Sequence, residues 1–211
     1  ALKQALKKRK EHSLDSWVLF IDLVKAFDTV PHSALWAVLR RRGIPAKLLG
    51  RIVALHTDVK VKLPVGDASA SFDYTIGVKQ GDSLAPVLFI FYIQAVLETL
   101  DRSSWTTPRF RFKMDDRLNG RSWRARGTEF DLRYSVYADD TALVFESRAD
   151  LERAASVLRS HFSRWGLSIH VGSSTKRSKT EAMLVPGPRA DYADFDTSDV
   201  ILPDGARIHF T

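Results

Sequence analysis

The chain has 211 residues, of which 45% are apolar, so it can bury the core of one sizeable domain. Its formal net charge of +7 and its isoelectric point of about 9.7 favour polyanionic partners. Because cysteine is absent, a disulfide framework and a zinc site built on thiolates are excluded. No signal peptide or membrane-spanning run is visible, so we expect an intracellular protein with no membrane partner.

The first predicted elements are a basic helix and a buried strand. Leu2, Ala5 and Leu6 mark the apolar side of the helix. Its basic side chains, which could contact nucleic acid but which we interpret as a solvated face, are Lys3, Lys7, Lys8, Arg9 and Lys10. The strand runs from residue 17 to residue 22, where an apolar, β-rich run ends in Asp22.

Two helical stretches and a hairpin follow, and then a helix expected from Leu84 to Leu97. Asp28 reads as a cap for the first stretch, beginning near Ser33. The helix from Leu84 is apolar nearly all the way round, which predicts a core helix, and its apolar run is too short to cross a bilayer. We expect Ser83 as its N-cap and Pro86 in its first turn.

Basic and aromatic residues alternate in the next segment, from residue 102 to residue 133. The basic residues are Arg109, Arg111, Lys113, Arg117, Arg121, Arg124 and Arg126, and they interleave with Trp105, Phe110, Phe112 and Trp123. Such a mixture could follow phosphates and stack on bases, or it could be an ordered insertion or a partly disordered loop.

An acidic hairpin comes after this segment. Leu132, Tyr134 and Val136 alternate before Tyr137-Ala138-Asp139-Asp140, and an apolar run from residue 142 to residue 145 follows. Two neighbouring carboxylates repel, so they cost stability unless a cation or hydrogen bonds compensate. The pair could also be a plain polar turn.

The last predicted elements are an amphipathic helix, a strand and a terminal hairpin. The helix shows an apolar stripe at three- and four-residue spacing, made of Leu151, Ala154, Ala155, Leu158, Phe162 and Trp165. Ser147 and Asp150 form a capping box at its start. The residues from 200 to 210 form two short strands around a Pro-Asp-Gly turn, whereas Asp191-Tyr192-Ala193-Asp194 only imitates the acidic tetrapeptide by coincidence.

Without the outlying pieces, the order is strand, helix, strand, strand, helix, strand. This order predicts an α+β fold with the ferredoxin-like β-α-β-β-α-β core, an antiparallel sheet and helices packed on one face. The first and third strands are then neighbours, which sets Asp22 beside Asp139 and Asp140. Three carboxylates at one edge suit a pair of Mg²⁺ ions, which at a separation of roughly 3.5 to 4 Å serve polymerases and nucleases.

Three blocks of the sequence resemble signature motifs of reverse transcriptases. They are, in order, residues 20–28 (Phe-Ile-Asp-Leu-Val-Lys-Ala-Phe-Asp), residues 77–86 (Gly-Val-Lys-Gln-Gly-Asp-Ser-Leu-Ala-Pro) and residues 137–140. They are most similar to those of non-LTR (LINE-like) retrotransposons. The resemblance implies the palm of an RNA-directed DNA polymerase; a group II intron maturase is the alternative lineage, although Val30-Pro31-His32 after the first block favours the retrotransposon branch.

The resemblance also implies roles for single residues. Asp22 and Asp139 would bridge two Mg²⁺ ions, for which Mn²⁺ could substitute, with Asp140 as the third catalytic carboxylate and the carbonyl of Leu23 as a further ligand. The nucleotide site would comprise Lys25, Ala26, Phe27, Gln80 and Gly81. Phe27 would be the gate against a ribose 2′-hydroxyl, or simply a core residue. Gln80 and Gly81 could instead form an ordinary turn, and Lys25 could meet phosphate or solvent.

A further block implied by the resemblance supplies a lysine near the departing pyrophosphate. Residues 166–170 and Lys179-Thr180-Glu181 match it, and Lys179 would act as a general acid. Lys176 is also eligible, and the loop from residue 173 could be merely mobile and solvated. The expected nucleic-acid contacts are Tyr137, Ala138, Arg121, Arg124 and Arg126.

The resemblance implies an RNA template, a DNA primer and dNTP as partners, and a nuclear location. We expect residues 1–211 to form a single reverse transcriptase domain, a palm with partial fingers. Residues 102–131 would be a basic insertion, and residues 199–211 a hairpin leading toward an absent primer grip and thumb. Such a fragment could keep its metal site while polymerisation is crippled, or it could be a catalytically silent nucleic-acid-binding scaffold. The sequence does not fix the oligomeric state.

Overall fold

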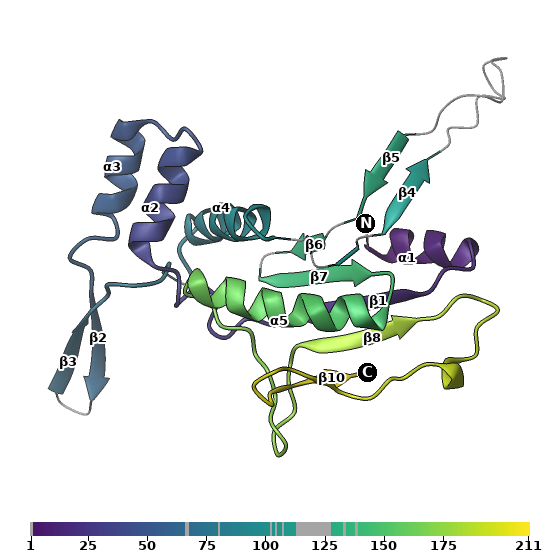
Figure 1. The fold of residues 1–211 in the computed structure, drawn as a ribbon. Helices are drawn as coiled ribbons and strands as arrows, with labels where there is room; N and C mark the ends of the chain where they lie inside the picture. The colour runs from purple at the N-terminus through teal and green to yellow at the C-terminus, as the bar shows by residue number, and fades with distance from the viewer. Residues whose placement is uncertain are drawn as a thin grey trace, which may run out of the picture. The chain divides into compact units, whose positions relative to one another are not determined.

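In the computed structural model, whose helices and strands are labelled in Figure 1, the chain divides into two compact units. The first unit comprises residues 1–22, 101–157 and 170–211, and the second comprises residues 23–100 and 158–169. The structure describes residues 2–65, 68–79, 81–101, 103, 105–106, 108–112, 128–132, 134–137 and 139–211.

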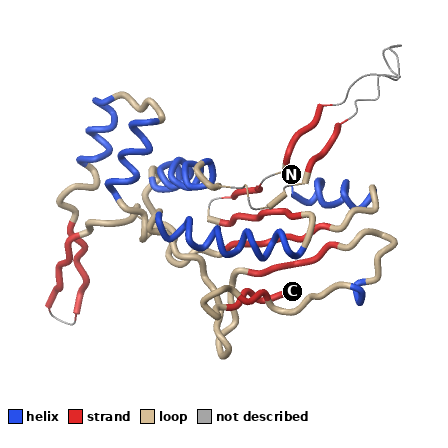
Figure 2. The backbone as a smooth tube through the Cα atoms, in the orientation of Figure 1, coloured by secondary structure: helices blue, strands red, loops and turns tan. Residues whose placement is uncertain are grey.

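The first unit is built on a mixed sheet with the strand order β6-β7-β1-β8-β10-β9 (Figure 2). Its strands are β1 (Ser16–Ile21), β6 (Tyr134–Tyr137), β7 (Asp140–Phe145), β8 (Glu181–Val185), β9 (Val200–Ile201) and β10 (Arg207–Phe210). All neighbouring strands pair antiparallel except β10 and β8, which run parallel. The prediction of a mixed α and β protein with a mostly antiparallel sheet is therefore confirmed.

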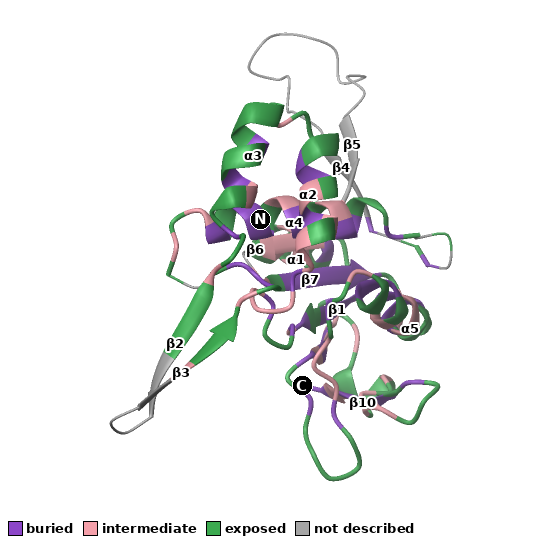
Figure 3. Cartoon of the chain, turned by 90° about the vertical axis from the view of Figure 1, so that its left-hand side faces the viewer, coloured by how far each residue is buried: buried purple, intermediate pink, exposed green. Residues whose placement is uncertain are grey.

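The centre of this sheet is buried, which explains why β1 and β7 are apolar almost throughout. β7 is buried from Thr141 to its end (Figure 3). On one face, Leu2 and Leu6 of helix α1 (Leu2–Glu11) pack against Val18 and Val144. The apolar side predicted for the opening helix is the side that it buries.

Arg9 corrects the interpretation of α1 as a helix with a fully solvated basic face. Its side chain is only 4% exposed. The guanidinium donates hydrogen bonds to the hydroxyl of Ser16 (2.8 Å) and to the carbonyl of Asp15 (2.6 Å), and it lies 3.7 Å from the carboxylate of Glu146. Burial lowers the pKa of Arg9, although Glu146 and Asp15 oppose this effect. Arg9 therefore anchors the helix to the sheet.

Helix α5 (Arg148–Arg164) follows β7 and begins as predicted. The backbone N–H of Asp150 donates to the hydroxyl of Ser147 (3.1 Å), which in turn donates to the Asp150 carboxylate (2.8 Å). Burial alone would raise the pKa of Asp150, but hydrogen bonds from Ser147, Thr106 and Arg153 outweigh it and hold the pKa below its usual value. Of the predicted stripe, Trp165 lies beyond the helix and is half-buried, whereas the other members, Leu151, Ala154, Ala155, Leu158 and Phe162, are all buried.

The remaining described elements of the first unit are short. Strands β4 (Arg109–Phe112) and β5 (Thr128–Asp131) pair antiparallel within the predicted basic insertion, of which residues 113–127 lie outside the described residues. The 3-10 helix η2 (Tyr192–Asp194) contains the last three residues of the tetrapeptide that imitates the acidic motif, and the carboxylate of its first residue, Asp191, caps the helix. Strands β9 and β10 form the expected terminal hairpin.

Besides the end of α5, the second unit contains three helices and a hairpin among its described residues. They are α2 (His32–Arg41), α3 (Ala46–Ala54), β2 (Lys60–Val65), β3 (Ala68–Asp73) and α4 (Ala85–Glu98). Helix α4 buries Phe89 and Tyr92 completely, as expected of a core helix, but Val87 and Ile90 on its other side are about half exposed. The hydroxyl of Tyr92 donates to the carbonyl of Trp165, and burial raises the pKa of Tyr92 to about 12.

Two predicted helix caps are wrong. Ser83 does not cap α4; instead the carboxylate of Asp82 accepts the N–H of Leu84 at 3.0 Å, because the chain makes a turn before the helix. Asp28 does not cap α2, which starts at His32 after Pro31 and has no side-chain cap. The N–H of Asp28 donates to the carbonyl of Lys25 at 2.9 Å, so Asp28 closes an earlier turn. None of the helices among the described residues is both long and apolar enough to cross a membrane.

Candidate active site at one edge of the sheet

The acidic tetrapeptide forms the tip of the β6–β7 hairpin. Tyr137 pairs with Asp140, so the chain reverses between the two strands, and Asp139 lies in this turn. Asp139 is half-buried and Asp140 is exposed, whereas Ala138 lies outside the described residues. The tight turn thus holds two carboxylates at the end of a strand that is otherwise buried.

The strand register brings Asp22 to the same edge. β1 pairs with β7 from Trp17 opposite Phe145 to Ile21 opposite Thr141. Continued by one residue, this register sets Asp22 across from Asp140, where opposing Cα atoms are typically about 4.5 to 5.5 Å apart. The edge therefore gathers the backbones of residues that are far apart in the sequence.

The backbone of Asp22 is fixed by residues on the opposite side of β1. Its N–H donates to the hydroxyl of Thr180 at 3.1 Å, and its carbonyl accepts the N–H of His170 at 2.8 Å. Sequence reasoning missed the roles of His170 and Thr180, because neither hydrogen bond follows a local pattern. These bonds hold Asp22 where β1 ends.

Lys179 lies two residues before β8, whose first residue Glu181 pairs with Phe20. Beside Asp22 itself runs the segment that ends at His170, whose N–H donates to the carbonyl of Asp22. The side chain of Lys179 is exposed, and its backbone N–H donates to Nδ1 of His170 at 3.1 Å. His170 therefore links the backbones of Asp22 and Lys179.

A cavity of about 380 Å³ opens beside Asp140. It is lined by Tyr137, Asp140, Phe20 and Ser135 together with Leu2 of α1. Tyr137 is 83% exposed, which suits a residue predicted to meet nucleic acid. Sequence reasoning did not single out Phe20 or Ser135, although alternation along β1 and β6 would have placed them on this face.

The acids are neighbours in the backbone but do not form a finished metal site. Among the described residues, no three His, Cys, Asp or Glu side chains converge closely enough to hold a metal ion. The donor set nevertheless suits Mg²⁺, which prefers carboxylate oxygens. Leu23, whose carbonyl was the expected further ligand, is buried and forms an isolated bridge with Ile169.

The predicted nucleotide-binding residues belong to the second unit. Lys25 is exposed with a positive φ of 48°, and Ala26 is buried. The ring of Phe27 stacks on Phe89 with 4.6 Å between centroids, but it is only half-buried, so packing leaves part of the ring accessible. Gln80 lies outside the described residues, as do Arg121, Arg124 and Arg126.

The first and second sequence blocks meet in this unit. The carbonyl of Phe27 accepts the N–H of Val78 at 2.7 Å. Gly77 has a φ of 90°, and a Cβ there would lie 2.7 Å from the carbonyl oxygen of Asp28 and 2.8 Å from the hydroxyl of Tyr74. Gly81 also has a positive φ, 86°, but open space surrounds it. Glycine is therefore required at position 77 for close approach and at position 81 for backbone conformation.

Burial raises the pKa of Tyr74, and the carboxylate of Asp28 adds to this effect. The Tyr74 hydroxyl thus stays protonated against the turn that joins the two blocks. His32 supports the same junction, because its Nε2 lies 2.6 Å from the carbonyl oxygen of Gly77.

Comparison with known proteins agrees with this arrangement of motifs. The family model described as "Reverse transcriptase (RNA-dependent DNA polymerase)" matches residues 2–188. The chain belongs to the reverse transcriptase family. The resemblance predicted from the three sequence blocks is therefore confirmed.

The relatives of this reverse transcriptase domain include proteins named "Retrovirus-related Pol polyprotein from type-1 retrotransposable element R2". The one from Nasonia vitripennis is 26% identical over 169 residues, which are 80% of this chain and 15% of that protein. The one from Popillia japonica is 28% identical over 186 residues, or 87% of this chain and 24% of that protein. A third, from Bradysia coprophila, is 25% identical over 187 residues, or 88% of this chain and 18% of that protein.

These relatives support the predicted branch of the family, that of non-LTR retrotransposons. The chain spans between 15% and 24% of the length of the three relatives.

Proposed function

We propose that this reverse transcriptase domain acts as an RNA-directed DNA polymerase that transfers a nucleotide from dNTP to a primer 3′-hydroxyl. The supporting observation is the strand register that leads Asp22, Asp139 and Asp140 to one edge of the sheet. Carboxylates at the ends of neighbouring strands are the ligands that a two-metal phosphoryl transfer requires.

Two Mg²⁺ ions, or Mn²⁺ in their place, would be held by Asp22 and Asp139, with Asp140 and the carbonyl of Leu23 as further ligands. When bound, such a pair stabilises the attacking and the leaving oxygens of an in-line displacement. The three side chains would have to rotate toward one another, and this is feasible because Asp139 and Asp140 stand at a hairpin tip and Asp22 just beyond a strand end. Lys179 would donate a proton to the pyrophosphate as it leaves, or its positive charge would neutralise the negative charge that develops there.

The nucleotide would be selected by Lys25, Ala26, Phe27, Gln80 and Gly81. Phe27 supports this role because its ring is packed on one face by Phe89 and remains half-exposed. A ring held in this way can stand under a sugar and disfavour a 2′-hydroxyl by bulk.

We further propose that the core has the ferredoxin-like topology, in the order β1, α4, β6, β7, α5 and β8. The strand order β6-β7-β1-β8 supports this topology, because it sets the first and third strands side by side. Residues 1–211 would then form one palm with partial fingers, residues 102–131 a basic insertion, and residues 199–211 a hairpin leading to a primer grip.

The partners would be an RNA template, a DNA primer and dNTP, and the enzyme would work in the nucleus. Tyr137 and Ala138 would meet the primer end, and Arg121, Arg124 and Arg126 would contact phosphates. The exposed Tyr137 ring beside the cavity and the net charge of +7 support this assignment.

The direct test is magnesium-dependent primer extension on an RNA template, comparing the wild type with Asp139→Asn. We expect the variant to lose extension, because an amide replaces a carboxylate ligand. Asp194→Asn is the matched control, since Asp194 occupies an exposed site in η2 within the imitating tetrapeptide. Equal extension by wild type and Asp139→Asn refutes the assignment. The assay should be repeated with finger and thumb segments of a relative fused to the chain, so that an incomplete polymerase is not mistaken for a wrong site.

One observation favours a second candidate, a palm that binds nucleic acid without turnover. Leu2 lines the same cavity as Tyr137 and Asp140, so the chain's own helix borders the space that a primer end would need. Titration with Mg²⁺ or Mn²⁺ separates the two functions, because a silent scaffold has no need of a paired metal site.

A further inference from the structure

A second polar cavity of about 240 Å³ lies in the first unit, around the loop that precedes β8. Residues 173–178 form one wall, and Asp199, Arg207 and His209 form the other. We call it the loop cavity. It is smaller than the roughly 300 to 1,000 Å³ of pockets that enclose whole drug-sized ligands, so it suits a single small group.

The loop is held in shape by its own hydrogen bonds. The hydroxyl of Ser173 accepts the N–H groups of Thr175 (3.3 Å) and Lys176 (3.2 Å), and the N–H of Ser173 donates to the carbonyl of Lys176 at 2.8 Å. The side chain of Lys176 is exposed. The loop therefore presents a cation from a fixed backbone.

The start of the loop is tied to the strand on the other wall. Gly172 and Arg207 exchange two backbone hydrogen bonds, of 2.8 and 3.1 Å. A Cβ at Gly172 would lie 2.7 Å from the nitrogen of Ser178 and would also overlap the carbonyl of Lys176, so only glycine lets the loop close this tightly. Arg207 is thereby held beside the loop.

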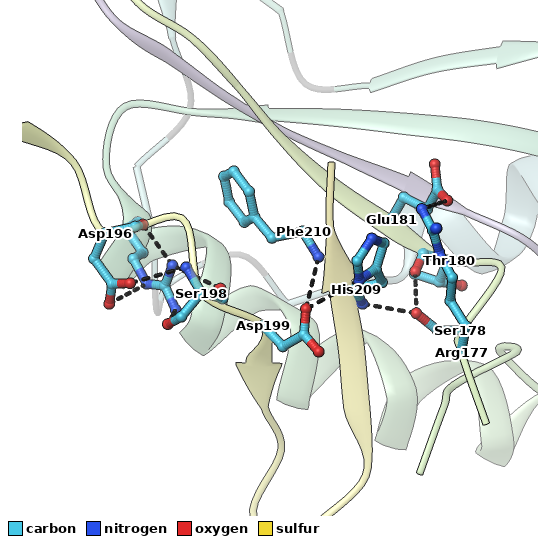
Figure 4. Close-up of polar contacts among 10 residues, drawn as sticks. Arg177, Ser178, Thr180, Glu181, Asp196, Ser198, Asp199, His209 and Phe210 are labelled. Carbon is cyan, nitrogen blue, oxygen red and sulfur yellow. Dashed lines mark hydrogen bonds and ion pairs between the residues drawn. The ribbon is translucent and has the colours of Figure 1, made fainter. Parts of the chain in front are cut away.

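The second wall is equally well supported (Figure 4). The carboxylate of Asp199 accepts Nδ1 of His209 and the N–H of Phe210, each at 3.1 Å, and the N–H of His209 donates to the hydroxyl of buried Ser178 at 2.7 Å. Just before Asp199, the guanidinium of Arg148 donates to the carbonyl oxygens of residues 196 and 198 (2.6 and 3.0 Å) and fixes that segment.

The charge of the lining is positive. Lys176, Arg177 and Arg207 contribute three cations, and Asp199 contributes one carboxylate whose Oδ1 already accepts two hydrogen bonds. The guanidinium of Arg177 forms an ion pair with the carboxylate of Glu181, with 3.2 Å between nitrogen and oxygen. Lys176 and Arg207 have no acidic partner among the residues that the structure describes. Serine and threonine hydroxyls complete a surface suited to an anion with several oxygen atoms.

We propose that the loop cavity binds a backbone phosphate of a nucleic-acid strand. The loop leads into β8, which lies between β1 and β10. The end of β10 (His209 and Phe210) pairs with the start of β8, whose Glu181 also pairs with Phe20 near the end of β1, so the cavity stands at the same end of the sheet as Asp22. Two strand spacings separate β1 from β10, about 10 Å. At about 3.4 Å per nucleotide, a strand that passes Asp22 would reach the cavity on the order of three nucleotides away. This binding requires neither metal ions nor turnover, so it does not rest on the proposed polymerase activity.

The test is binding of a labelled single-stranded oligothymidine by fluorescence anisotropy, without divalent ions or dNTP, over a range of salt concentrations. The double variant Lys176→Gln/Arg207→Gln removes the two cations without acidic partners, and both side chains are exposed, so the fold should survive; thermal melting checks this. Because one phosphate contact on a single strand contributes about 0.7 to the slope of log K against log salt, we expect the slope to fall by about 0.7 and affinity to fall about fivefold at 0.1 M salt. The charge-conserving variant Lys176→Arg/Arg207→Lys should retain binding.

The matched control is Arg40→Gln/Lys47→Gln, which lowers the net charge of +7 by the same two units at exposed sites on α2 and α3. An equal loss in this control overturns the proposal, because binding would then follow net charge alone. Unchanged affinity in Lys176→Gln/Arg207→Gln overturns it as well. Competition with inorganic phosphate and pyrophosphate distinguishes the sources of phosphate: if the double variant loses only their binding and keeps that of the oligonucleotide, the cavity serves a free phosphate and the nucleic-acid assignment is wrong.

Discussion

Gly77 joins the first two sequence blocks, and its replacement by alanine should weaken the second unit by an amount that the structure sets. With φ at 90°, an alanine there costs about 1 to 2 kcal/mol of backbone energy. The new Cβ would also lie 2.7 Å from the carbonyl oxygen of Asp28, which belongs to the backbone and must shift, at a further cost of about 1 to 3 kcal/mol. The expected loss in the free energy of unfolding is therefore about 2 to 5 kcal/mol.

Gly81→Ala is the matched control for this experiment. Gly81 has nearly the same φ, 86°, but no atom lies within 4 Å of the position of a Cβ. Only the backbone cost of about 1 to 2 kcal/mol should remain. Urea unfolding of both variants measures the difference, and Tyr74→Phe in the Gly77→Ala background should recover part of the loss by removing the second clash. Equal destabilisation by Gly77→Ala and Gly81→Ala would show that the close approach of the two blocks is not real.

Three further predictions concern single residues. Asp150→Asn should lower stability at neutral pH by about 1 kcal/mol through loss of the cap with Ser147. Because the pKa of Asp150 is lowered in the fold, the stabilisation by its carboxylate is present above the usual carboxyl pKa and disappears as the pH falls through the lowered value. If the difference in melting temperature between the wild type and Asp150→Asn persists in acid, this reasoning is wrong. Phe27→Ala should increase ribonucleotide incorporation in primer extension, whereas Phe89→Leu, which disturbs the same ring stack from the core side, should not; an equal shift in both removes the gate role. Gly172→Ala should displace the loop before β8 and weaken oligonucleotide binding in the anisotropy assay, and full retention of binding would show that the loop geometry is unimportant.

The parts of the fold that could be predicted from the sequence are those with a local signal. The hairpin around Asp139 follows from alternating apolar residues on either side of a polar turn, and the start of α5 follows from Ser147 and Asp150 at capping distance. The pairing of β1 with β7 could be inferred because few topologies fit the order of the elements. From that pairing it followed that Asp22 lies near the hairpin.

The parts that could not be predicted depend on contacts between distant residues. Asp28 has the chemistry of a helix cap, but the chain first closes a turn on the carbonyl of Lys25, and sequence alone does not rank these two hydrogen bonds. Arg9 looked like one more solvated cation because its partner Ser16 lies beyond the end of the helix. The loop cavity required the parallel pairing of β10 with β8, for which no local pattern exists.

The central claim is that the carboxylates of Asp22, Asp139 and Asp140 hold a shared pair of divalent cations. The most direct measurement is a Mn²⁺ titration of the chain in the presence of dNTP, in which electron paramagnetic resonance counts the bound ions and detects coupling between them. We predict a coupled pair in the wild type and in Asp194→Asn, and its loss in Asp22→Asn and in Asp139→Asn. A wild type that binds no such pair, or variants that bind it as the wild type does, would contradict the claim.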